Sequence, residues 1–121
     1  MAEKKKINSK QKGARFEREL AKRFQHYGYE GARRTAQYCG NTGDASDVVG
    51  LPYIHVEAKH QERMHLYDWM EQAKRDAALN DSFLLPTVFH RQNSHEVLVT
   101  MELSDWMQLY ARFEASMKSE G

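Results

Sequence analysis

The order of helix-type and strand-type patterns predicts an α/β fold for this chain of 121 residues. Apolar residues recur with helical spacing before residue 28, between residues 66 and 79, and after residue 104. Short runs typical of strands lie between these segments, so the expected order is helix, three strands, helix, two strands, helix. Such an order is typical of a sandwich in which helices flank a central mixed sheet.

The first helix is expected to run from Asn8 or Ser9, either of which can cap it, to about Tyr27. Gly28 is the predicted stop, and Glu17 falls at the edge of the apolar stripe. The residues on that stripe are Phe16, Leu20, Phe24 and Tyr27. One face of this helix should therefore be buried.

The remaining elements follow from alternation and from turn residues. We expect a strand at 32–36, a loop at 37–46 rich in Gly, Asn and Asp, two strands joined by a turn at Pro52, and further strands at 84–90 and 96–100. A second helix should cover 66–79, and Ser104 should cap a last helix that continues to Met117. The predicted buried face of the second helix consists of Leu66, Trp69, Met70, Ala73 and Ala77.

The strand after Pro52 carries the most informative side chains. Because strand residues alternate between faces, Ile54, Val56 and Ala58 should point into a core. His55, Glu57 and Lys59 then share the opposite face, and Asp47, just before the preceding strand, should lie near Glu57. Two carboxylates hold a hard divalent cation, and a neighbouring ammonium orients water or stabilises developing charge. The pattern indicates a metal-dependent hydrolase.

Charge and cysteine content indicate the kind of binding partner and the cellular compartment. Residues 1–23 hold nine basic and three acidic residues, a net +6 in a chain whose formal charge is +1. A basic segment on a mildly acidic body suits a polyanionic partner, although a solvated helix face is the alternative. The single cysteine, Cys39, favours a reducing compartment. No apolar run is long enough for a membrane span or a signal peptide, so we expect a cytoplasmic protein.

The chain resembles the archaeal-type Holliday-junction resolvases of the PD-(D/E)xK nuclease superfamily. The resemblance begins at residues 12–20, Lys-Gly-Ala-Arg-Phe-Glu-Arg-Glu-Leu, and continues through the Gly-aromatic pair at Gly28, the arginines at 33–34 and a glycine-containing loop. It ends on Asp47 and the Glu-Ala-Lys at 57–59. Residues 62–63 and 84–86 also look like small phage-encoded nucleases of this superfamily. The first motif reads Ser46-Asp47 here, where the superfamily usually has Pro-Asp.

The resemblance implies a restriction-endonuclease-like αβββαβ core with an extra C-terminal helix, formed by residues 9–121 as a single domain after a flexible basic arm at 1–8. It also implies that Asp47, Glu57 and the Ala58 carbonyl ligate Mg²⁺, for which Mn²⁺ substitutes. Lys59 would contact the attacking water and the phosphate; a salt bridge to Glu57 is the alternative, for which the geometry is expected to be poor. Glu17 would reach the site from the helix edge.

DNA contacts are expected from Lys12, Arg15, Arg33 and Arg34, with Arg34 favoured over Arg33 as the family's phosphate contact. Gln72 lies where some members place a polar helper, but an exposed helix residue is the preferred interpretation. Six histidines raise a zinc hypothesis, which their spacing does not support. Trp106, Met107 and Phe113 are interpreted as core or dimer surface.

The resulting hypothesis is a Mg²⁺-dependent DNA endonuclease, resolvase-like and selective for branched DNA, acting as a homodimer in the cytoplasm (the host's, if phage-encoded) without a small-molecule cofactor. Alternatives are a flap, nick or duplex nuclease of the same fold, a catalytically silent DNA-binding module, and an α/β protein unrelated to nucleic acid.

Overall fold

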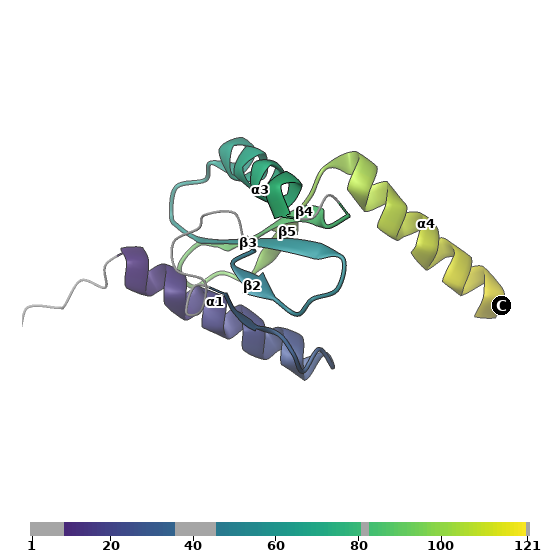
Figure 1. Ribbon diagram of the computed structural model, residues 1–121, viewed down its shortest axis with the longest axis horizontal. Coiled ribbons are helices and arrows are strands. Elements are labelled where there is room, and N and C mark those ends of the chain that lie inside the picture. The colour runs from purple at the N-terminus through teal and green to yellow at the C-terminus, as the bar shows by residue number, and fades with distance from the viewer. Residues whose placement is uncertain (1–8, 36–45, 81–82, 121) are drawn as a thin grey trace, which may run out of the picture.

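The computed structural model describes residues 9–35, 46–80 and 83–120, and its elements follow the predicted order (Figure 1). The predicted arm at 1–8 and most of the predicted loop at 37–46 lie outside the described residues. The elements are α1 (Ser9–His26), β1 (Arg33–Arg34), β2 (Val48–Val49), β3 (Ile54–His60), α3 (Leu66–Asn80), β4 (Leu85–Arg91), β5 (Leu98–Thr100) and α4 (Leu103–Glu120).

The five strands form one mixed sheet in the order β1-β2-β3-β4-β5. Neighbouring strands are antiparallel except β3 and β4, which run parallel from the pair Ile54–Leu85 to the pair His60–Arg91. Two parallel neighbours need a crossover connection, and α3 supplies it. Helices α1 and α3 lie on opposite faces of the sheet (Figure 1), so the predicted mixed sheet, consistent with a restriction-endonuclease-like core, is confirmed.

Helix α1 covers one face of the sheet with the predicted stripe, apart from one residue. Phe16, Leu20 and Phe24 are buried. Their partners from the sheet include Val48, Val56 and Phe89, and Ile54 and Ala58 pack at the margin of the same core. Three of the four predicted stripe residues are therefore confirmed, together with the inward face of β3.

The prediction was wrong for Tyr27, which is 79% exposed. The reason is the way α1 ends. Gly28 adopts a left-handed φ of 104°, its N–H donates to the Gln25 carbonyl at 2.9 Å, and the Tyr29 N–H donates to the Phe24 carbonyl at 3.0 Å. This is a Schellman cap, and it turns the chain before Tyr27 can reach the sheet.

Helix α3 covers the other face of the sheet. Trp69, Met70 and Ala73 form a second core with Val88 of β4, and Ala77 is buried as predicted. The predicted cap of the last helix was wrong: the Trp106 N–H donates to the Glu102 carbonyl at 3.0 Å, so Ser104 lies inside the first turn. Among the described residues, no helix is long and apolar enough to cross a bilayer.

A tight turn fixes β2 against β3. Gly50 has a φ of 93°, and a Cβ atom there would lie 2.5 Å from the Gly31 carbonyl oxygen. Only glycine permits this approach, because it has no Cβ and adopts positive φ without strain. The turn after β2 thus packs against the segment that precedes β1. Asp47 immediately precedes β2.

Candidate active site

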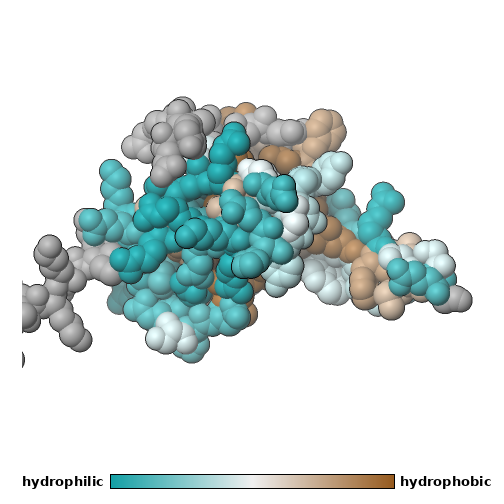
Figure 2. Space-filling view, turned by 90° about the horizontal axis from the view of Figure 1, so that it is seen from below, coloured by the Kyte–Doolittle hydropathy of each residue, from teal (hydrophilic) through white to brown (hydrophobic). Residues whose placement is uncertain are grey.

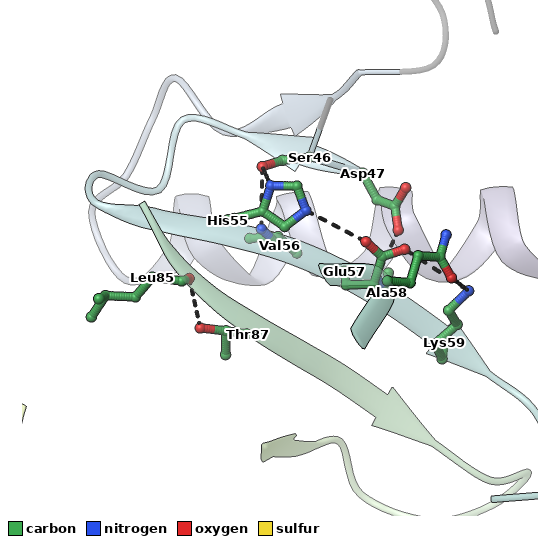
Figure 3. A network of polar contacts seen from close by, with 10 residues as sticks. Ser46, Asp47, His55, Val56, Glu57, Ala58, Lys59, Leu85 and Thr87 are labelled. Carbon is green, nitrogen blue, oxygen red and sulfur yellow. Dashed lines mark hydrogen bonds and ion pairs between the residues drawn. The ribbon is translucent and has the colours of Figure 1, made fainter. Parts of the chain in front are cut away.

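Asp47, immediately before β2, lies beside Glu57 of the neighbouring antiparallel strand β3, as predicted (Figure 3). The Asp47 N–H donates to the Val56 carbonyl at 2.8 Å, and the Ala58 N–H donates to Asp47 Oδ2 at 2.8 Å. These two bonds place the Asp47 carboxyl beside the Glu57–Ala58 peptide. Glu57 is 3% exposed and therefore is not a surface strand residue, and Asp47 is half-buried beside it.

The pKa of Asp47 is raised from its ordinary 3.8 to about 8. Burial is the largest cause, since it disfavours the charged form, and the negative charge of Glu57 is the next. Glu17 raises the pKa further, while the Ala58 N–H and Lys59 lower it. The site therefore concentrates more negative charge than its surroundings neutralise, which is the electrostatic condition that a bound cation relieves.

Lys59 points to the same side of the sheet as Glu57, and its ammonium is held by α3. Its Nζ donates to Gln72 Oε1 at 3.1 Å and lies 3.9 Å from Glu57 Oε2. Two expectations need correction here. Gln72 is a half-buried partner of Lys59 rather than an exposed helix residue, and an ion pair of Lys59 with Glu57 does form, at the outer limit of distance.

Glu17 and Arg34 bind each other at the edge of the site. Arg34 Nε donates to Glu17 Oε1 at 2.8 Å, and both side chains are less than one-fifth exposed. Glu17 is thus held from α1 rather than solvated, and its charge acts on Asp47. The bond joins two residues that the sequence assigned to separate roles.

A buried chain of hydrogen bonds reaches Glu57 from the side opposite Lys59 (Figure 3). The Val56 N–H donates to Ser46 Oγ at 3.3 Å, Ser46 Oγ lies 3.0 Å from His55 Nδ1, and His55 Nε2 lies 3.4 Å from Glu57 Oε1. A carboxylate only accepts, so His55 Nε2 is the donor in the hydrogen bond to Glu57. Ser46, where the superfamily usually has proline, therefore orients His55.

Asp76 of α3 is a neighbour that the sequence interpretation missed. One ligand atom each from His55, Glu57 and Asp76 lies within 4.8 Å of the others, so these three residues form a candidate metal-ligand group among the described residues. The available signal was spacing: Gln72 and Asp76 are four residues apart and flank the buried stripe of α3. The spacing arguments against zinc did not consider a histidine paired with carboxylates.

A groove runs from the site between the first turns of α1 and the end of β3. Its volume is about 480 Å³, and its lining includes Lys12, Ala58, Lys59 and Arg63. The positive charge of Lys12, after burial, lowers the pKa of His60 in the same groove. Of the other predicted DNA contacts, Arg15 and Arg33 are exposed and lie outside this lining.

Over residues 8–120, the chain matches the family described as "Phage putative PDDEXK endonuclease". Because the match covers nearly the whole chain, the protein belongs to this family of phage PD-(D/E)xK nucleases, as the resemblance indicated. Nucleases of this kind typically depend on a divalent metal, and their substrate is DNA. The curated proteins and the solved structures gave no match.

The raised pKa of Asp47 predicts how stability depends on pH without metal. The unfolded chain loses this proton near pH 3.8 and the folded chain near pH 8, so the contribution of Asp47 to stability is full below the lower value and is lost as pH rises through the higher one. In EDTA, Asp47→Asn should therefore melt increasingly above wild type from about pH 5 to about pH 9, measured by circular dichroism.

Glu30→Gln, at an exposed position after α1, is the matched control and should show a constant difference over this range. Mg²⁺ at the upper pH should raise the melting temperature of wild type and not that of Asp47→Asn, because binding to the folded state stabilises it. A gap between Asp47→Asn and wild type that does not change with pH would contradict the assignment.

Proposed function

We propose that this nuclease hydrolyses DNA phosphodiester bonds with Mg²⁺ held by Asp47 and Glu57. The observation that carries the proposal is the crowded pair of carboxyl groups, Asp47 just before β2 and Glu57 on β3, with Lys59 directed to the same side. A carboxyl group with a strongly raised pKa, such as Asp47, is typical of functional sites. This arrangement disfavours a catalytically silent module.

The donor set fits a hard cation. Asp47, Glu57 and the Ala58 carbonyl would supply oxygen ligands, which Mg²⁺ prefers and Mn²⁺ also accepts. Oδ2 of Asp47 and Oε1 of Glu57 already accept bonds from Ala58 and His55, and these bonds fix how the carboxyl groups are turned. Bound Mg²⁺ lowers the pKa of a coordinated water and withdraws charge from the phosphate.

The protein's own groups would orient the reactants. Gln72 holds the ammonium of Lys59 beside Glu57, where it can hydrogen-bond the attacking water or a phosphate oxygen. Glu17, fixed by Arg34, adds negative charge on the α1 side and can hold a water or a second cation. Attack in line with the leaving oxygen would produce a 5′-phosphate, as in the family it resembles.

The groove supports DNA as the ligand, since Lys12, Lys59 and Arg63 line it together. The exposed Arg15 and Arg33, and Arg34 through its guanidinium, are proposed as further phosphate contacts, with the basic segment at 1–8. We propose branched DNA as the preferred substrate and a homodimer with paired sites, acting in the host cytoplasm. A flap, nick or duplex preference is the alternative.

The test of this proposal is cleavage of a panel containing a four-way junction, a flap, plain duplex and single-stranded DNA in Mg²⁺. Asp47→Ala and Glu57→Ala should each lower turnover by at least about 100-fold, since loss of even an outer partner of a metal ligand costs 10–100-fold. DNA binding in EDTA should persist in both variants, because neither substitution touches the basic residues that line the groove.

Glu30→Gln is again the matched control and should cleave at the wild-type rate. Wild-type turnover in either alanine variant would exclude this metal site. Equal rates on all duplex-containing substrates would leave the nuclease assignment intact and refute branch selectivity.

The position of Lys12 in the groove predicts how DNA binding depends on salt. Lys12→Ala should reduce the slope of log K against log salt by about 0.9 on duplex DNA, the effect of one lost phosphate contact. Lys22→Ala is the matched control: Lys22 is exposed on the same helix, ten residues further along, and outside the groove. Fluorescence anisotropy in EDTA measures both slopes. Equal slopes for Lys12→Ala and wild type would show that DNA does not follow this groove.

A further inference from the structure

Helix α4 is amphipathic, yet its apolar side has no cover in the described chain. None of its eighteen residues is buried, and the helix projects from the body (Figure 1). Figure 2 shows hydrophobic surface gathered toward α4, in contrast to the hydrophilic outer surface of α1. Seven large apolar side chains on α4 are between 43% and 74% exposed: Leu103, Trp106, Met107, Leu109, Tyr110, Phe113 and Met117.

The spacing of these residues is that of a helix-pairing seam. Steps of three and four residues alternate along the series Leu103, Trp106, Tyr110, Phe113 and Met117. This is the a/d repeat by which two helices pack side by side. The rings of Trp106 and Tyr110 stack on the seam with centroids 5.2 Å apart. The opposite side of the helix carries small or polar residues: Ser104, Asp105, Gln108, Arg112, Ala115 and Ser119.

A helix with an exposed apolar face is stabilised by a packing partner. Most helical stability in proteins comes from the packing of an apolar face rather than from helix propensity, and the apolar face of α4 has no such packing among the described residues. The charges of α4 favour neither a nucleic-acid partner nor an anionic membrane, because both bind basic faces. Its three acidic and two basic residues give a net charge of −1.

The exposed apolar area agrees with a two-fold pairing. Fully covered Phe, Tyr and Trp side chains bury about 150–250 Å² each, and Leu and Met are taken near the lower end of that range. Seven of them, each about half exposed, therefore offer roughly 700 Å², close to the roughly 800 Å² that each partner contributes to a standard interface. A two-fold axis brings the same patch of both copies together, so a single self-complementary stripe is sufficient. Leu98 and Val99 of the edge strand β5, each 58% exposed, lie just before the stripe in the chain.

We propose that the apolar stripe of α4 binds the same stripe of a second copy of this chain. The inference rests on the proposed function in one respect, because it names the surface of the homodimer that paired cleavage requires. The stripe is separate from Asp47 and Glu57, which lie just before β2 and on β3, so association and cleavage can be measured independently.

The experiment is sedimentation equilibrium of the full chain without DNA, over a range of concentrations. Wild type should reach twice 14.1 kDa in the micromolar range. The double variant Tyr110→Glu/Phe113→Glu should raise the dissociation constant at least about 100-fold, since two interface anchors are lost. Ala115→Glu adds a charge to the opposite side of the same helix and should dimerise like wild type.

Circular dichroism at equal concentration checks that the sheet and the two packed helices of each variant still fold. A wild-type chain that stays monomeric up to about 100 μM would overturn the proposal without requiring any variant. Equal dissociation of the Ala115→Glu and stripe variants would also overturn it. A dimer that cleaves no DNA would instead refute the proposed function and leave the α4 pairing standing.

Discussion

The rest of the site depends on the close approach of two carboxyl groups, Asp47 and Glu57, in a place shielded from water. Burial and mutual repulsion raise the pKa of Asp47 to about 8, so the folded chain holds this group against its ordinary tendency to ionise. The backbone enforces the arrangement: the Ala58 N–H holds the Asp47 carboxyl, and the Asp47 N–H bonds to the carbonyl of Val56. Local destabilisation of this kind is typical of functional sites, where the surrounding fold offsets it.

Residues from α1, from α3 and from the segment around Ser46 fix the side chains around this carboxyl pair. From α1, Glu17 is fixed by Arg34, and α1 is itself tied to β4 by two hydrogen bonds of 2.7 and 2.8 Å from Arg91 to Glu19. From α3, Gln72 holds Lys59. Ser46 and His55 form a buried chain of hydrogen bonds that turns Glu57. Helices on both faces of the sheet are thus required for one site at its β2–β3 junction.

Local patterns were sufficient to predict the parts of the structure that depend on chain periodicity. Alternation on β3 placed Val56 in the core and Glu57 with Lys59 on the other face, and helical spacing identified Phe16, Leu20 and Phe24. The predictions were wrong where tertiary packing, rather than the local sequence pattern, determines the position of a side chain. Tyr27 lost its burial to a cap, and Gln72 and Asp76 reach the site only because the crossover lays α3 over β3. The partnership of Ser46 with His55 joins residues nine apart across a turn, which no periodicity reports.

The most direct test of the account is titration calorimetry of Mn²⁺ or Mg²⁺ into the metal-free chain, in buffers of different ionisation heat. Near pH 7 the Asp47 carboxyl still holds its proton in the metal-free protein, so binding should release close to one proton per ion. The release should vanish above about pH 9, and Asp47→Asn should abolish tight binding. Binding without proton release, or with equal affinity in Asp47→Asn, would contradict the claim that this crowded carboxyl pair is the metal site.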